Sequence, residues 1–490
     1  MFEDSIAPRD AQWREALRKE KTAKERTSIA RVRMTELAPG IRVRSNDEVN
    51  RGLTAAQAFT EASRCLDCPD PQCVTGCPVG INIPGFIKNL ERENTVEALR
   101  VIKETSALPA VCGRVCPQER QCESRCIYNK MKKEPVAIGY LERFAADNGA
   151  DQLTADTPAR NHHKVAVVGS GPAGLSFAGD MIKRGYDVTV FEALHQIGGV
   201  LKYGIPEFRL PNSIVDREID SLTAMGVNFV KDCVIGKTLS YDDLLNQGFE
   251  GVFVASGAGL PRFMGIPGEN LIGVLSSNEY LTRINLMGAG RGGDTPAPTG
   301  KRIAVIGGGN TAMDSVRTAM RMGAEKAMIV YRRSEAEMPA RVEEVRHAKE
   351  EGVEFLTLCN PVEYLADENG AVRAMRVQRM ELGEPDSSGR RSPVAIEGAI
   401  DEIEVDAVIV SVGVSPNPLI PNSVDGLEIT RRGTIAVNDT TLRSSLPTLF
   451  AGGDIVRGGA TVILAMGDGR QAAAAMHAQI QEQSQTDSKS

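Results

Sequence analysis

Eight of the ten cysteines of the chain lie between residues 65 and 126, in two groups. The first group reads C-x2-C-x4-C-x3-C-P and the second reads C-x3-C-P-x4-C-x3-C; their cysteines are Cys65, Cys68, Cys73 and Cys77, then Cys112, Cys116, Cys122 and Cys126. Short gaps let several thiolates converge on one inorganic core, and a proline after a cysteine is a feature of bacterial ferredoxin motifs, although the four-residue gap departs from their spacing. The pattern favours iron–sulfur clusters, with zinc held by four thiolates as the alternative.

A glycine-rich turn follows the cysteines. The apolar run 164–168 predicts a strand, Leu175–Arg184 predicts a helix, and the turn between them is made of Gly169, Ser170, Gly171, Pro172, Ala173 and Gly174. The first glycine allows the tight turn, the second lets the backbone approach a pyrophosphate, and the third lets helix and strand pack closely. Glu192 ends the next strand, 23 residues after Gly169, where it can accept hydrogen bonds from a ribose. The alternative is a glycine loop without a ligand.

The C-terminal part offers a partner for this turn. The segment 448–454 predicts a strand that contains Gly453 and ends in an acid, Asp454. A long helix of small residues then begins after Gly458, with Gly459, Ala460 and Thr461 at its start. An aspartate there can hold a ribityl hydroxyl, and the positive end of the helix can stabilise a reduced flavin. This half therefore favours FAD over NAD.

A second copy of the motif begins at Lys301. After the strand 303–306 come Gly307, Gly308, Gly309, Asn310, Thr311 and Ala312, then a helix to Met322 and a strand 327–331. Where an NAD site would place an acid, this chain has Arg332 and Arg333, with Arg341 beyond them. Guanidinium groups would pair with a 2′-phosphate, so the pattern indicates NADPH, with a solvated basic strand end as the alternative.

Composition sets the remaining limits. A chain of 490 residues suggests about three domains. The net charge of −7 gives no reason to expect nucleic acid as a partner. The N-terminus lacks the features of a secretory signal and no apolar run approaches membrane-spanning length, so we expect a cytoplasmic protein without a membrane. Neither nucleotide unit contains C-x-x-C, which excludes the relay of a disulfide reductase and leaves the cysteine groups as the electron exit.

The N-terminal region is expected to be mostly helical. Thr54 and Gln57 have the form of a capping box for a helix leading to Cys65, and 83–90 and 95–103 have apolar residues at helical spacing. Residues 1–35 suggest a solvated arm, 149–163 suggest a linker, and Cys233 and Cys359 suggest buried bystanders.

At this point the chain resembles a known family. From about Ala55 to Ala475 it resembles the small (beta) subunit of NADPH-dependent glutamate synthase, through Cys-Gly-Arg-Val-Cys-Pro-Gln-Glu-Arg at 112–120, Tyr-Gly-Ile-Pro-Glu-Phe-Arg-Leu-Pro at 203–211 and Gly-Gly-Gly-Asn-Thr-Ala-Met-Asp at 307–314. It is also similar to the electron-bifurcating ferredoxin-NADP transhydrogenase large subunit and to the N-terminal half of dihydropyrimidine dehydrogenase.

The resemblance implies a multidomain fold, an α-helical iron–sulfur domain followed by two α/β Rossmann-like domains, with FAD, NADPH and two 4Fe-4S clusters. We accordingly expect a cluster domain at 1–150, an FAD-binding domain at 160–290 and 431–480, an NADPH-binding domain at 291–430, and a flexible tail at 481–490.

The resemblance also implies individual residues. Contacts to FAD are implied for Gly199, Arg209 and Val234, and contacts to NADPH for Gly309 to Thr311 and Ser411 to Gly413. One cluster would be held by Cys65, Cys68, Cys73 and Cys126, the other by Cys77, Cys116, Cys122 and Glu142, with Cys112 a bystander. The alternative makes Cys112 the last ligand.

By resemblance, the function is electron input: hydride transfer from NADPH to FAD, then single-electron steps to a large subunit with FMN and glutaminase sites, in a hetero-oligomer. No catalytic acid or base can be named. A ferredoxin transhydrogenase or sulfide-dehydrogenase-type subunit with another acceptor is the second hypothesis, and a zinc-stapled, nucleotide-binding regulatory protein is the third.

Overall fold

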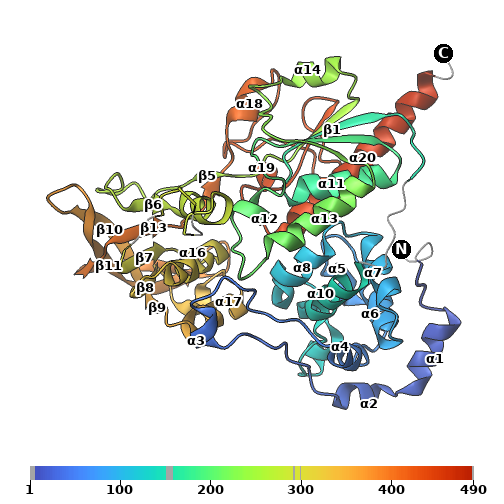
Figure 1. The fold of residues 1–490 in the computed structure, drawn as a ribbon, viewed down its shortest axis with the longest axis horizontal. Helices are drawn as coiled ribbons and strands as arrows, with labels where there is room; N and C mark the ends of the chain where they lie inside the picture. Colours follow the sequence, from blue (N-terminus) through green and yellow to red (C-terminus); the bar gives the residue numbers. More distant parts are fainter. Residues whose placement is uncertain (1–5, 151–157, 291–292, 298–299, 488–490) are drawn as a thin grey trace.

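The computed structural model describes residues 6–150, 158–290, 293–297 and 300–487. Figure 1 shows a helical N-terminal region, a first nucleotide unit above it and a second nucleotide unit beside it. Residues 151–157 of the predicted linker lie outside the described residues. None of the helices in the described ranges is both long and apolar enough to cross a membrane.

The N-terminal region is built of short helices around the cysteines. Its elements are α1 Gln12–Glu20, α2 Ala23–Ser28, α3 Pro39–Arg42, α4 Ala55–Ala62, α5 Gln72–Thr75, α6 Ile83–Glu91, α7 Thr95–Lys103, α8 Pro109–Val115, the 3₁₀ turns η1 Gln118–Arg120 and η2 Glu123–Arg125, α9 Ile127–Lys130 and α10 Ile138–Gly149. The predicted capping box of α4 is present, because Thr54 Oγ1 accepts the Gln57 N–H and Gln57 Oε1 accepts the Thr54 N–H. The other two predicted helices are α6 and α7.

The composition of residues 1–35 predicts a solvated arm, and this prediction is wrong for α1 and α2, which each bury an arginine. Arg14 of α1 is 3% exposed and its Nη2 lies 2.5 Å from Oδ1 of Asp67, between the first two cysteines. Arg26 of α2 is 2% exposed and pairs with Glu91 at 2.6 Å. Since buried guanidinium groups need such partners, the arm is anchored on the first cysteine group.

The first nucleotide unit is a parallel sheet in the order β15-β4-β1-β2-β3. Its strands are β1 Lys164–Val168, β2 Asp187–Phe191, β3 Asn228–Val230, β4 Gly251–Val254 and β15 Leu449–Ala451; its helices are α11 Pro172–Lys183, α12 Val200–Tyr203, α13 Asn212–Ala224, α14 Tyr241–Asn246, α18 Leu419–Ser423, α19 Asp454–Arg457 and α20 Val462–Asp487. Gly469 lets α20 lie directly on α11, because a Cβ there would stand 2.3 Å from the Ala173 carbonyl oxygen.

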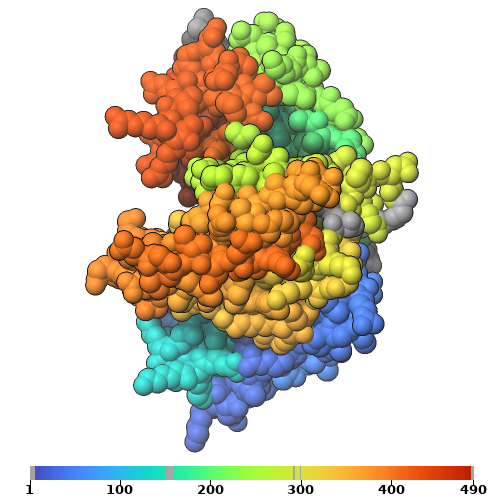
Figure 2. Space-filling view, turned by 90° about the vertical axis from the view of Figure 1, so that its left-hand side faces the viewer, coloured from blue at the N-terminus to red at the C-terminus, as the bar shows by residue number. Residues whose placement is uncertain are grey.

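The second nucleotide unit is a parallel sheet in the order β6-β13-β7-β8-β9, and Figure 2 shows it facing the viewer, with the first unit above it and the helical region below it. Its elements are β6 Val274–Ser276, α15 Ser277–Leu281, the π-helical turn η4 Thr282–Leu286, β7 Arg302–Ile306, α16 Asn310–Arg321, β8 Lys326–Tyr331, the 3₁₀ turn η5 Glu335–Glu337, α17 Val342–Glu350, β9 Glu354–Thr357 and β13 Ala407–Val410. An antiparallel sheet, β10 Cys359–Ala366, β11 Val372–Pro385 and β12 Arg391–Glu404, is inserted before β13.

The two units exchange chain at a pair of short strands, which corrects the predicted domain limits. β5 Leu260–Pro261 and β14 Val414–Ser415 pair where the chain enters and leaves the second unit. β6 precedes residue 291 but belongs to the second sheet, and Ile420 packs with Val252 of the first unit although it precedes residue 431. The described residues of the Gly- and Pro-rich stretch 288–300, which are 288–290, 293–297 and 300, therefore lie between η4 and β7 and do not mark a domain boundary.

The C-terminal end also differs from the prediction. α20 continues to Asp487, so residues 481–487 of the expected flexible tail are helical, and residues 488–490 lie outside the described residues.

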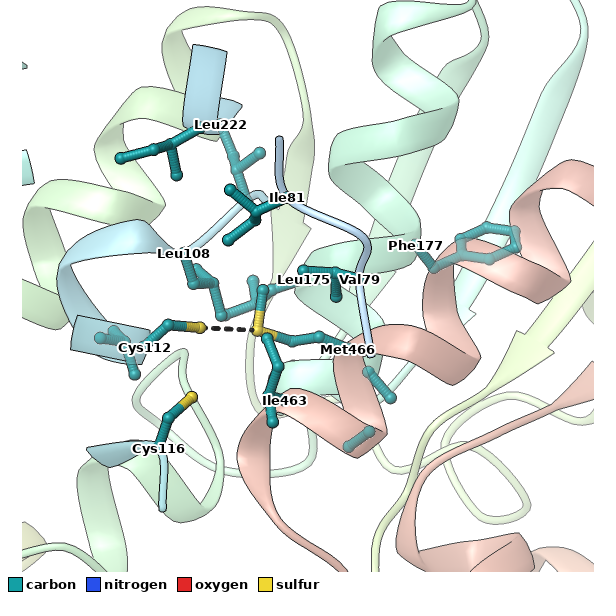
Figure 3. Close-up of a cluster of buried hydrophobic side chains, with 14 of the residues drawn as sticks. Val79, Ile81, Leu108, Cys112, Cys116, Leu175, Phe177, Leu222, Ile463 and Met466 are labelled. Carbon is teal, nitrogen blue, oxygen red and sulfur yellow. Dashed lines mark hydrogen bonds between the residues drawn. The ribbon is translucent and has the colours of Figure 1, made fainter. Parts of the chain in front are cut away.

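A single hydrophobic cluster joins the helical region to the first unit, since Cys112 and Leu108 lie in it with Leu175 and Met466 (Figure 3). The cysteine region and the first unit therefore share one core.

Candidate functional site

The first glycine turn has the backbone geometry that its predicted roles require. Gly169 has φ +103°, and a Cβ there would lie 2.5 Å from the Ala255 carbonyl oxygen. A Cβ on Gly174 would lie 2.0 Å from the Gly169 carbonyl oxygen, so only glycine lets the helix meet the strand there. A Cβ on Gly171 would meet no described atom within 4 Å. Gly171 thus leaves open space at the N-terminus of α11, ahead of Pro172 and Ala173, where a phosphate can bind.

Glu192 lies beside this turn, as predicted. Its Oε2 accepts hydrogen bonds from the Ser170 N–H (2.9 Å) and Oγ–H (2.5 Å), and its Oε1 accepts one from the Leu194 N–H. A carboxylate can accept about four hydrogen bonds, so it retains capacity for a ribose hydroxyl. Cys233 donates its N–H to the Glu192 carbonyl (2.9 Å), which places the adjacent Val234 near the acid.

Two further segments reach the same turn. Gly199 has φ +53°, and a Cβ on it would lie 3.0 Å from the Cα of Gly171. Gly453 has φ +76°, and a Cβ on it would lie 3.0 Å from the Cβ of Ala173. The chain has therefore brought three backbone segments together around the space at Gly171, as a long dinucleotide requires.

Asp454 follows Gly453 directly. Burial raises the pKa of its carboxyl to about 6, against a hydrogen bond from the Ala460 N–H that lowers it. The segment Gly459, Ala460 and Thr461 leads into α20, and the hydrogen bond from Ala460 places the Asp454 carboxylate beside the start of that helix.

The second glycine turn borders a cavity of about 660 Å³. The lining includes Gly307, Gly309, Thr311, Arg332, Arg333, Arg390 and the segment Ser411 to Gly413. Gly307 has φ +138°, and a Cβ on it would lie 2.3 Å from the Ser411 carbonyl oxygen, so the turn and the end of β13 are in contact. Asn310 and Ala312 lie in the first turn of α16, where Ala312 is buried. The site has the size of a nucleotide pocket.

Arg341 is not brought to this cavity, which corrects its predicted pairing with a 2′-phosphate. Its Nη1 donates to the Arg114 carbonyl oxygen (2.8 Å) and its Nη2 to Gln118 Oε1 (2.9 Å), both in the helical region. Its backbone N–H donates to Asn310 Oδ1. Arg341 thus fastens the second unit to the cysteine region, because a buried guanidinium binds the nearest acceptors.

Arg209 is likewise held elsewhere. Its Nη1 lies 2.8 Å from Asp314 Oδ2 and its Nε 3.3 Å from Glu344 Oε1, both in the second unit. These pairs tie Arg209 to the second unit, and the contact with FAD that the resemblance implied stays a prediction.

The structure gathers Cys65, Cys68, Cys73 and Cys126 in one place. Burial raises the pKa of Cys73, and the charges of Cys65, Cys126 and Cys68 raise it further. Burial raises the pKa of Cys65 to about 11. Thiolates in such a group need a positive partner, which cluster iron supplies.

Cys77, Cys116 and Cys122 lie together with Glu142. Burial raises the pKa of Cys122 well above its usual value, with contributions from Cys77, Glu142 and Cys116. Burial also raises the pKa of Glu142 to about 8. Its Oε1 is buried with no hydrogen-bond partner among the described residues. A buried carboxylate oxygen without a partner beside three thiols is what a ligand to a cluster would leave in a structure without the cluster.

Cys112 lies next to Cys77, Cys116 and Glu142. It is fully buried and its Sγ is 3.4 Å from Sδ of Met466 (Figure 3). A hydrogen bond with Cys116 and burial raise its pKa. Both Cys112 and Glu142 are therefore near Cys116, and the arrangement keeps both as candidate ligands.

The spacing of the cysteines does not suit a single zinc ion. Zn–S bonds of about 2.3 Å place tetrahedral sulfurs about 3.8 Å apart. Across the described ranges, just one group has three or more His, Cys, Asp or Glu ligand atoms within 4.8 Å of one another, namely Glu36, Glu343 and His347, and it contains no cysteine. The sulfurs are spread more widely, as around a larger cluster. Glu36 is already paired with a cation, because Nη2 of Arg346 lies 2.6 Å from its Oε1.

Sequence reasoning missed two parts of these sites. Arg390 lines the second cavity from a hairpin far along the chain, and no local signal marks it. Gln121, just before Cys122, places its Nε2 3.5 Å from Thr461 Oγ1 and so joins the second cysteine group to the start of α20.

Comparison with protein families gives two matches that divide the chain as the fold does. Residues 42–153 match the model described as dihydropyrimidine dehydrogenase domain II, 4Fe-4S cluster, and residues 163–476 match pyridine nucleotide-disulphide oxidoreductase. The first match covers the two cysteine groups, and the second covers both glycine turns.

Individual proteins are similar over most of the chain. The glutamate synthase (NADPH) small chain of Azospirillum brasilense is 37% identical over 442 residues, 88% of this chain and 91% of that protein. The NADP(+)-dependent formate dehydrogenase subunit beta of Moorella thermoacetica is 38% identical over 431 residues, 82% of this chain and 59% of that protein. The structure of Mycobacterium tuberculosis FprA in complex with NADPH has a TM-score of 0.56 at 20% identity, covering 66% of this chain and 86% of that one, and shows the shared fold.

The geometry and the comparisons agree on the class of protein. The chain is an NADPH-dependent flavin oxidoreductase with a 4Fe-4S cluster domain, and its cofactors are FAD, NADPH and 4Fe-4S clusters. The prediction of these cofactors and of the overall fold class is confirmed.

Proposed function

The chain belongs to the family of NADPH-dependent glutamate synthase small chains, and we propose that it is the electron-input subunit of such an enzyme. NADPH is oxidised at the second unit, FAD is held on the first, and electrons leave through two clusters to a large subunit that carries FMN and glutaminase sites. That partner makes glutamate from glutamine and 2-oxoglutarate. The bound groups supply hydride acceptance, by FAD, and single-electron transfer, by the clusters.

One observation carries this proposal: the second cysteine group lies against the helix that opens at the flavin site. Gln121 reaches Thr461 at the start of α20, and Cys112 contacts Met466 one turn further along. Cys116 and Cys122 are buried there and Cys77 beside them is partly exposed, whereas all four of Cys65, Cys68, Cys73 and Cys126 are partly exposed. Electrons that leave the flavin thus meet the buried group first and the partly exposed group second, where a partner can receive them.

The residues of the two nucleotide sites follow from the same geometry. We assign FAD to the first turn and the segments that reach it, with Glu192 on the ribose: Gly169, Gly171, Pro172, Ala173, Gly174, Glu192, Gly199, Val234, Gly453, Asp454, Gly459, Ala460 and Thr461. We assign NADPH to the second cavity: Gly307, Gly309, Asn310, Thr311, Ala312, Arg332, Arg333 and Gly413. Arg332 and Arg333 would bind the 2′-phosphate through charge-assisted hydrogen bonds.

For the clusters, we assign the partly exposed one to Cys65, Cys68, Cys73 and Cys126. The buried one is assigned to Cys77, Cys116, Cys122 and Glu142. The free Oε1 of Glu142 and the contact of Cys112 with Met466 support Glu142 over Cys112.

The test uses the purified chain with its cofactors, alone and with the polypeptide that co-purifies with it. Alone, it should oxidise NADPH with an artificial acceptor and form no glutamate from glutamine and 2-oxoglutarate. With the large subunit, glutamate should form in proportion to NADPH consumed. Glutamate production by the chain alone would contradict the assignment of an input subunit.

A second candidate is an NADP-dependent ferredoxin transhydrogenase or sulfide-dehydrogenase-type flavoprotein subunit. The similarity to a formate dehydrogenase subunit favours keeping it, because a relative of equal identity has a different enzyme as its context. Co-purification with a polypeptide lacking a glutaminase region, together with reduction of ferredoxin by NADPH, would select this candidate.

A further inference from the structure

Arg333, which lines the second cavity, has one guanidinium N–H group without a hydrogen-bond acceptor among the described residues. Its side chain is 6% exposed, and Nη2 lies 2.5 Å from Oδ2 of Asp386. Its Nε is buried and has no hydrogen-bond partner in the part of the chain that the structure describes. Since a buried guanidinium N–H without an acceptor is unfavourable, this side chain is built to receive a further acceptor from the cavity.

Asp386 reaches Arg333 from the tip of the hairpin between β11 and β12. The tip is closed by the Asp386 N–H donating to the Arg390 carbonyl oxygen (2.8 Å). The Ser388 N–H (2.8 Å) and Oγ–H (2.5 Å) both donate to Oδ1 of Asp386. Hydrogen bonds from Ser388 and then the pairing with Arg333 lower the pKa of Asp386, so the tip presents a carboxylate to Arg333.

The same tip carries a cation into the cavity. Arg390 lines the cavity together with Arg332 and Arg333, and its Nε donates to Ser388 Oγ at 2.9 Å. The hairpin therefore brings a carboxylate, Asp386, and a guanidinium, Arg390, to the proposed phosphate site at Arg332 and Arg333.

We propose that Asp386 is an internal competitor for the 2′-phosphate: it occupies Arg333 in the empty site, NADPH displaces it, and Arg390 then contacts the phosphate. The inference rests on the proposed function, in which Arg332 and Arg333 receive that phosphate. A phosphate monoester carries between one and two negative charges and three acceptor oxygens, so it pairs with Arg333 more strongly than one carboxylate does.

This competition lowers the affinity of the site for a nucleotide that carries a 2′-phosphate. A carboxylate and a phosphate repel one another, so the hairpin tip must move when the phosphate binds and returns when the product leaves. NADP(H) is thereby bound less tightly, and the oxidised product is released more readily, than two free arginines would allow. A nucleotide with a bare 2′-hydroxyl leaves the Asp386–Arg333 pair in place and is unaffected.

The experiment measures binding of adenosine 2′,5′-bisphosphate and of AMP to the cofactor-loaded protein by calorimetry, in a phosphate-free buffer. Asp386→Asn should bind the bisphosphate about tenfold more tightly, the range of one charge-assisted hydrogen bond, and AMP as before. Arg390→Ala should bind the bisphosphate about tenfold more weakly and AMP as before. The matched control is Asp401→Asn, which removes the carboxylate that pairs with Arg379 on the same antiparallel sheet.

The outcomes separate this inference from the proposed function. If Asp386→Asn binds the bisphosphate equally or more weakly, Asp386 only positions Arg333 and the competitor role is wrong. Ser388→Ala keeps the carboxylate but frees the tip, and should move affinity in the same direction as Asp386→Asn. If Arg332→Ala with Arg333→Ala leaves bisphosphate binding unchanged, the NADPH assignment itself fails.

Discussion

The Sγ atom of Cys112 lies 3.4 Å from the Sδ atom of Met466, across the boundary between the helical region and the first nucleotide unit. α8, which carries Cys112, is followed directly by Cys116, and Met466 lies near the start of α20. Both side chains are fully buried in the common core. The buried cysteine group and α20 thus share one hydrophobic core.

This contact gives the ligand assignment of the buried cluster a sharp test. Cys112→Ser should keep the iron content and both electron paramagnetic resonance signals of the reduced protein, because the proposed assignment gives Cys112 no iron to bind and leaves it packed on Met466. Glu142→Ala should lose or shift one signal, because it removes the ligand with the free carboxylate oxygen. Iron analysis and spectra of both variants check this.

The reverse result would assign the ligand to Cys112. Glu142→Gln is a useful control, since it keeps the volume and one oxygen while removing the charge. Circular dichroism checks that both Glu142 variants fold. If both are folded and each has one perturbed signal, the change comes from loss of a ligand and not from loss of the fold.

The first glycine turn predicts opposite outcomes for two neighbouring substitutions. Gly171→Ala should fold normally, since its φ of −71° suits alanine and its Cβ points into open space, but it should bind FAD weakly because the methyl group takes the place of the pyrophosphate. Gly174→Ala should fail to fold stably, because its Cβ would stand 2.0 Å from the Gly169 carbonyl oxygen. Flavin content and melting temperature of the FAD-free proteins distinguish the two. Equal melting temperatures would show that the close approach at Gly174 can relax.

The nicotinamide preference can be tested at the end of β8. Replacing Arg332 and Arg333 by alanine removes charge-assisted hydrogen bonds of about 1.5–3 kcal/mol each, so KM for NADPH should rise by roughly tenfold or more while NADH kinetics stay nearly constant. Steady-state reduction of an artificial acceptor with each nucleotide measures this. Unaltered kinetics with both nucleotides would reject the phosphate assignment. Lys326→Ala, at the other end of β8, is the control.

The glycine turns and the short helices could be predicted because their causes are local. Gly169, Gly171 and Gly174 act on backbone within a few residues, and the capping box of α4 joins residues three apart. The grouping of the cysteines was also implied in advance by resemblance, and the structure brings the same residues near one another.

What failed depends on partners far away in the chain. Arg341 binds a carbonyl oxygen 227 residues from it. The pairing of Arg333 with Asp386, 53 residues away, was missed for the same reason, while its role toward a 2′-phosphate stays a prediction. The arginines of the N-terminal arm read as solvent-exposed because Asp67 and Glu91 could not be recognised as their buried acceptors. A charged side chain has no local signature that tells a surface position from a buried pair.

Glu351 provides the last prediction, which concerns stability and its dependence on pH. Its fully buried carboxylate lies 2.9 Å from Arg42, 2.8 Å from Arg317 and 2.7 Å from Arg321, and so ties α3 to the second unit. Burial alone would raise its pKa, but the hydrogen bonds from Arg321 and Arg317 outweigh burial and lower the pKa to about 2, from 4.5. The ionised form is therefore favoured by folding.

The sign of the effect follows. A lowered pKa contributes stability above pH 4.5 that disappears as the pH falls through about 2. Glu351→Gln should lower the free energy of unfolding by about 3 kcal/mol at pH 7, and the gap to the wild type should narrow steadily below pH 4.5. Urea unfolding at several pH values measures it. Glu335→Gln, which removes an exposed pair with Lys349, should change stability by less than about 1 kcal/mol. A gap that stays constant from pH 7 to pH 3 would show that Glu351 acts through its shape and not through its charge.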